Sequence, residues 1–203
     1  MDWDDGSVYG ENLYHSKPWL NLAKHPRFYH ADGNLTVIIG DMQYKLHRYL
    51  FKKCSWFFQS NGEPTYLLGF THKDFDHFLS ILYPQDYSEE ECKTAEEWTS
   101  VLTVAVDAGM QDVRRLAIKR LTSLASPVDK IALGHRYNIK EWLGPAYLAL
   151  AMRKEPISSL EGAKIGIEAL VRVAALKDEV FANLTSYVDQ NKFSELFASK
   201  LAL

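Results

Sequence analysis

The 203-residue sequence predicts an α+β fold, in which a small sheet near the amino terminus is followed by helices. Three features support this prediction. β-Branched and aromatic residues at 35–39 and 44–46 flank Gly40-Asp41, which favours a tight hairpin because glycine accepts positive φ. From His47 the apolar residues recur at spacings of three and four, the period of an amphipathic helix. After residue 126 only helical signals occur.

Two further elements are predicted on either side of the hairpin and its helix. Residues 18–28 are expected to form a short helix that ends at His25-Pro26, because the residue before a proline is pushed away from helical ψ. A short strand is predicted at 66–68, behind a stretch of turn-forming residues.

Capping residues predict the starts and ends of the next helices. Thr71 and Thr94 each precede an acidic residue three positions later and then an apolar face, the pattern of a capping box. Gly109 stands where a helix end favours left-handed φ, and Asp112 opens the helix behind it. Ser126-Pro127 is the sharpest start signal, since serine caps a helix and proline fits its first position.

The last third of the chain is predicted to be helical, with two interruptions. Gly144-Pro145 is expected to break one helix, because proline removes a backbone hydrogen bond. Pro156 and the serines behind it separate a final segment, 160–187, whose apolar spacing suits one helix or a helix pair. The tail 193–203 is weakly amphipathic.

Composition excludes several classes of function. The formal charge is −3 and no long basic run occurs, which argues against direct nucleic-acid binding. Cys54 and Cys92 lie outside any Cys-x-x-Cys pattern, so neither a disulfide framework nor a zinc site is expected and an intracellular, reducing compartment (cytoplasm or nucleus) is predicted. The acidic amino terminus does not resemble a secretory signal. The longest nearly apolar run, 143–152, is too short to span a bilayer.

Side chains with catalytic or metal-binding chemistry occur, but no pattern brings them into a site. His47, at a strand-to-helix junction, is interpreted as a packed, hydrogen-bonded structural histidine. The run 72–77 holds four potential metal ligands, but no second cluster completes a coordination shell, so no metal or other cofactor is predicted. A small enzyme with a site around His135, Arg136 and Tyr137 is kept as an alternative, supported only by their proximity in sequence.

Residues 44–58, here called the signature segment, carry a family resemblance. Behind a strand-turn-strand, the segment resembles the aromatic-x-x-His-Lys/Arg-x-x-Leu-x-x-x-Ser-x-x-Phe signature of BTB/POZ domains, and the order of the following elements is similar. Residues 126–177 are similar to the helical region of a large group of fungal BTB proteins. The matching residues of the signature segment are Tyr44, His47, Arg48, Phe51, Ser55 and Phe58.

The resemblance implies three regions and a function without catalysis. The regions are an amino-terminal arm (1–24), a BTB/POZ domain (25–125) and an all-α carboxyl-terminal extension (126–203). BTB domains commonly form homodimers through their first helix and exchanged strand edges. Some recruit transcriptional regulators and others are substrate adaptors of cullin-type ubiquitin ligases. The resemblance thus implies a non-enzymatic module for self-association and recruitment of protein partners.

Three positions bear on which partner is expected. Repressor-type members pair a buried aspartate with a basic residue after the histidine; here Arg48 matches but Asn34 stands at the aspartate position. Cullin-binding members often carry a hydrophobic-x-Glu motif, whereas Glu63 has polar Asn61 two residues before it. Both departures count against these mechanisms. Trp56 is predicted to point away from its apolar neighbours on the helix and is an interface candidate.

Overall fold

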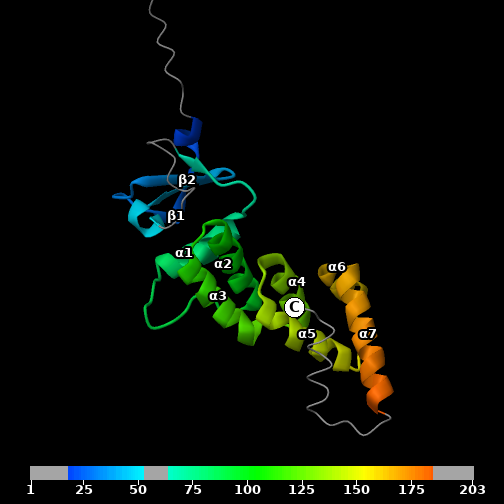
Figure 1. Cartoon of the computed structure of the whole chain (residues 1–203). Coiled ribbons are helices and arrows are strands. Elements are labelled where there is room, and N and C mark those ends of the chain that lie inside the picture. The colour runs from blue at the N-terminus through cyan, green and yellow to red at the C-terminus, as the bar shows by residue number, and fades with distance from the viewer. Residues whose placement is uncertain (1–17, 53–63, 185–203) are drawn as a thin grey trace, which may run out of the picture. The chain divides into compact units, whose positions relative to one another are not determined.

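The computed structural model describes residues 18–52 and 64–184 (Figure 1). Its backbone contacts divide the chain into two compact units, residues 1–72 and 73–203, so the boundary expected between residues 125 and 126 falls inside the second unit. The predicted α+β class is confirmed: the described residues contain one four-stranded sheet and seven α-helices. None of these helices is long and apolar enough to cross a membrane.

The sheet of the first unit is built on the predicted hairpin. Strands β2 (Leu35–Ile39) and β3 (Met42–Leu46) pair antiparallel, with Leu35 opposite Leu46 and Ile39 opposite Met42. Gly40 has φ of 55°, the positive value that the hairpin prediction requires. The order is β1-β3-β2-β4, in which β1 (Ala23–Tyr29) is parallel to β3 and the short β4 (Thr65–Tyr66) is parallel to β2.

The helix predicted at 18–28 is wrong. Residues Pro18–Asn21 form only a 3₁₀ turn, and Ala23–Tyr29 is strand β1. Proline cannot donate a hydrogen bond to a sheet. Among the described strands, however, β1 pairs only with β3, and an edge strand tolerates a proline. The pairing shifts register between Lys24 and Tyr29, and in this stretch His25 Nδ1 accepts the backbone N–H of Phe28 at 2.9 Å. A side chain thus replaces strand pairing where Pro26 interrupts it.

The amphipathic helix expected from His47 onward is described only in its first turn. Residues Arg48–Phe51 form a 3₁₀ turn (η2), and residues 53–63 lie outside the described part of the chain. Phe51 is fully buried, as its place on the predicted apolar face requires. The buried apolar side chains of the first unit include Phe28, Leu35, Val37, Ile38, Ile39, Tyr44, Leu46, Phe51 and Leu67.

The second unit is helical, and the caps predicted at Thr94 and Ser126 are present. Thr94 caps α2 (Ala95–Asp107) and Ser126 caps α4 (Pro127–Tyr137); each forms a complete capping box with the acidic residue three positions later. Gly109 (φ 68°) ends α2 in the predicted left-handed conformation. The other helices up to α5 are α1 (His72–Leu82), α3 (Gln111–Leu124) and α5 (Lys140–Met152). Helix α1 begins at the last residue of the first unit.

Pro145 does not interrupt its helix, in contrast to the prediction. Helix α5 runs through Gly144-Pro145 because Trp142, Leu143, Ala146 and Tyr147 on either side of the break are all buried. Tertiary packing therefore outweighs the backbone hydrogen bond that proline removes.

The final segment is a helix pair, one of the two arrangements that its sequence allows. Gly166 (φ 84°) separates α6 (Ser159–Ile165) from α7 (Ile167–Leu184). Helices α4, α5 and α7 share one apolar core, in which Ile131 is completely buried. This core contains Val128, Ile131, Leu143, Ala146, Tyr147, Leu150, Ala151, Ala169, Val173 and Leu176.

Candidate interaction site

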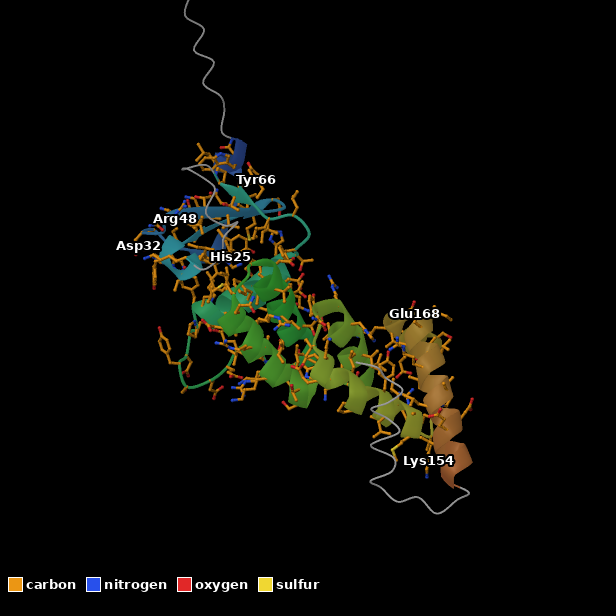
Figure 2. All side chains as sticks on the ribbon, in the orientation of Figure 1. His25, Asp32, Arg48, Tyr66, Lys154 and Glu168 are labelled. Carbon is orange, nitrogen blue, oxygen red and sulfur yellow. The ribbon has the colours of Figure 1, made fainter. Side chains whose placement is uncertain are left out.

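The signature segment supplies core residues of the first unit. Tyr44, on β3, is completely buried, and its ring stacks on His25 with 4.6 Å between ring centroids. Its hydroxyl lies 3.4 Å from Nδ1 of His72. Figure 2 labels His25, which lies on strand β1. Tyr44 and Phe51 thus act in packing, and the structure makes neither of them accessible to a partner.

His47 lies in a small polar cluster at the end of β3. Its Nε2 is 3.2 Å from Oδ2 of Asp32, and its ring centroid is 5.1 Å from that of His30. The hydrogen bond from His47 lowers the pKa of the Asp32 carboxyl. Burial, followed by the charge of His47, lowers the pKa of His30, against an opposing effect of Asp32. The predicted hydrogen bond of His47 is therefore present, and its partner is an exposed aspartate.

Asn34 is joined to the signature segment through the backbone. Its side-chain Oδ1 accepts the N–H of Arg48 at 2.8 Å, while its own N–H donates to the carbonyl of Leu46 at 2.9 Å. Asn34 therefore fixes the start of the 3₁₀ turn at the end of β3. The amide oxygen does this without the negative charge that an aspartate would place there.

Four of the predicted site residues lie outside the described part of the chain. These are Ser55, Trp56, Phe58 and Glu63. The predictions for the interface at Trp56 and for the cullin-type motif at Glu63 therefore remain predictions.

The residues of the alternative enzyme site have separate partners in the second unit. Nε2 of His135 is 2.9 Å from the hydroxyl of Tyr147, whereas the hydroxyl of Tyr137 is 2.8 Å from Oγ1 of Thr103. Arg136 lies over the ring of Tyr137, with 5.3 Å from its guanidinium carbon to the ring centroid. These contacts attach the end of α4 to α5 and α2.

The run 72–77 is also divided among different partners. Nε2 of His72 is 3.3 Å from Oδ1 of Asp41. Lys73 forms an ion pair of 3.0 Å with Glu96, and Asp74 accepts a 2.5 Å hydrogen bond from Ser100. In the described ranges, no group of three or more His, Cys, Asp or Glu side chains is arranged to hold a metal ion.

A polar cavity of about 500 Å³ in the second unit was not predicted from the sequence. Asp74, Glu96 and Asp129 contribute carboxylates to it, but each contacts a protein partner; that of Asp129 is Lys164. Burial raises the pKa of Asp129, yet the hydrogen bonds from Lys164 and Ser126 outweigh it and the net pKa is lowered. The charges of the cavity are therefore largely compensated within the unit. No sequence signal joins its residues, because they come from α1, α2, α4 and α6.

Comparison with known proteins identifies no relative: no protein-family model, no curated protein and no solved structure matches the chain.

Proposed function

We propose that this chain is a BTB/POZ-type interaction module, which self-associates and recruits a protein partner inside the cell and catalyses no reaction. The observation that carries the proposal is the signature segment. In its described part, the aromatic residue and the apolar residue of the motif (Tyr44 and Phe51) are both completely buried. The histidine and the basic residue between them (His47 and Arg48) are held by Asp32 and Asn34. The described part of the motif is thus held by packing and hydrogen bonds of the first unit.

The sheet supports the self-association part of the proposal. Strand β1 borders only β3, and β4 borders only β2, so each has one edge that no described strand pairs with. Such edges are the surfaces through which another chain can extend a sheet. The family resemblance implies association at exchanged strand edges and at the helix expected behind His47.

Light scattering on the full chain tests self-association. The expected mass is at least about twice the 23.2 kDa of the single chain at micromolar concentration, with a return toward 23.2 kDa on dilution. A mass of 23.2 kDa at every concentration would refute this part of the proposal.

A substitution at Trp56 tests the predicted interface. Trp56→Ala is expected to weaken dimerisation or partner capture about tenfold or more, since aromatic anchors carry much of the energy of an interface. Trp19→Ala is the matched control, because Trp19 lies outside the signature segment and is partly exposed. An equal effect of the two substitutions would contradict a specific role for Trp56.

Affinity purification with a cullin scaffold distinguishes the adaptor version of the function from other forms of recruitment. Retention of the scaffold by the full chain, and its loss with Glu63→Arg, is the result expected of a ligase adaptor. If the scaffold is not retained, the adaptor version is wrong and the recruited partner belongs to another class.

A further inference from the structure

Helix α7 has two apolar faces, and the described part of the unit covers only one of them. Ala169, Val173, Leu176 and Val180 are buried, with exposed fractions of 9% or less. On the opposite side, Ile167 is 75% exposed and Val171 62% exposed, and Ala174 is exposed as well. An ideal helix places these three side chains within about 60° of one another. A helix that is apolar on both sides is typical of one that is covered on both sides.

The outer face, defined here as Ile167, Val171 and Ala174, is flanked by two charges of opposite sign. Glu168 and Arg172 are both exposed, and neither forms an ion pair within the described part of the chain. Figure 2 labels Glu168 at the amino-terminal end of α7. Glu168 and Arg172 are four residues apart, so a helix places them on the same flank of the outer face. Burial raises the pKa of the Tyr147 hydroxyl on α5, while Arg172 lowers it and Glu168 raises it.

This arrangement is complementary to itself in an antiparallel pair. When two copies of α7 pack antiparallel about a twofold axis near residue 170, a flank of one helix adjoins the same flank of the other. Glu168 and Arg172 lie two residues to either side of that axis. Each glutamate then adjoins the arginine of the other copy, and Ile167 of one helix fits between Val171 and Ala174 of the other.

We propose that the outer face of α7 binds a second copy of this chain, antiparallel and about a twofold axis near residue 170. The inference goes beyond the proposed function, since the surface lies in the helical region and is separate from the strand edges and the signature segment. Two other occupants of the outer face are distinguished by the tests below: the chain's own tail, residues 193–203, and an unrelated protein.

A single cysteine tests the register directly. In Val171→Cys the two thiols lie almost opposite each other, so mild oxidation of the full chain is expected to give a disulfide-linked dimer that reductant removes. Asp178→Cys is the matched control on the same side of α7, because eight residues from the twofold axis place the two copies of that thiol about 24 Å apart along the helices. Wild-type protein under the same oxidation shows the background from Cys54 and Cys92. Equal cross-linking of the two variants would overturn the inference.

The charge pair provides a second and independent test. Glu168→Arg and Arg172→Glu are each expected to weaken self-association several-fold, since each places like charges next to one another across the pair. The double variant Glu168→Arg/Arg172→Glu restores the pairing and is expected to associate like wild type. Additive losses in the double variant would overturn the inference.

The mass of the Val171→Asp variant separates this inference from the proposed function. Val171→Asp is expected to lower the mass of the full chain relative to wild type, whereas Tyr87→Asp, at a 94% exposed position in a loop, leaves it unchanged. A Val171→Asp protein that stays dimeric like wild type overturns the inference and leaves the BTB-type dimer in place. A wild-type assembly larger than a dimer that Val171→Asp reduces to a dimer supports both interfaces. A monomeric Val171→Asp protein supports the inference and refutes the BTB-type dimer. If maleimide labels the cysteine of Val171→Cys only after residues 193–203 are removed, the tail is what covers the outer face, and the inference is overturned.

Discussion

Replacement of Asn34 by alanine tests the local account of the signature segment. The substitution removes the oxygen that accepts the N–H of Arg48 at 2.8 Å, the bond that fixes the start of the 3₁₀ turn. Loss of one such bond costs about 1 kcal/mol, which corresponds to an approximately fivefold faster opening of the bonded amide. Asn34→Asp keeps an oxygen at this position and is expected to preserve the bond.

Amide hydrogen exchange followed by NMR measures this opening at single residues. The Arg48 amide is expected to exchange about fivefold faster in Asn34→Ala, while the amide of Ile39, in β2, changes little. Asn21→Ala, at another exposed asparagine, is the matched control. An unchanged Arg48 rate would refute the assignment of the bond. A uniform acceleration across the sheet would show that Asn34 acts on the stability of the whole unit.

Three further substitutions test other parts of the fold. In Gly33→Ala the new Cβ meets the backbone carbonyl oxygen of Lys45 at 2.8 Å, so urea unfolding is expected to show a loss of about 1–3 kcal/mol. In Ile131→Ala a completely buried side chain leaves a cavity, and the same titration is expected to show a loss of about 3 kcal/mol; a loss below about 1 kcal/mol would contradict this. The pKa of Glu161 is lowered from 4.5 to about 2, mainly by its hydrogen-bonded ion pair with Arg153 and next by the backbone N–H of Ser158. Its contribution to stability is therefore complete above pH 4.5 and disappears as the pH falls toward 2, and Glu161→Gln is expected to flatten this acid dependence in thermal unfolding.

Local signals in the sequence were sufficient for the hairpin and for the helix caps at Thr94 and Ser126. Gly40 and Gly109 have the positive φ that was predicted, and Ser126 forms its capping box with Asp129. In each of these cases the determining residues lie within a few positions of one another. A single sequence shows such short-range chemistry directly.

Strand β1 and the continuity of α5 depend on long-range packing, and the sequence signals there are misleading. Pro26 suggested a helix end, but residues 23–29 gain their partners from β3, at least sixteen positions further along the chain. Pro145 suggested a break, but the apolar residues around it are buried in the core shared with α4 and α7. Local helix and strand propensities do not reflect contacts between residues that are far apart in the sequence.

The candidate site could be predicted only in part for a similar reason. The packing role of Tyr44 and Phe51 follows from their spacing, whereas the contact of His47 with Asp32 depends on a turn fifteen residues earlier in the chain. The outer face of α7 could have been found from the sequence, because Ile167, Val171 and Ala174 recur at helical spacing. It was hidden by the stronger apolar pattern of the buried face of the same helix.

The parallel pairing of β1 with β3 has a consequence for synthesis of the chain on the ribosome. The partner of β1 emerges 16–19 residues later, which at ~5–20 residues per second is a delay of about 1–4 s. The β2–β3 hairpin then forms within about 1–10 μs. During the delay Phe28, which is buried in the folded unit, has no sheet to pack on. We therefore expect the nascent amino-terminal segment to be a transient target for chaperones until residue 46 has left the exit tunnel.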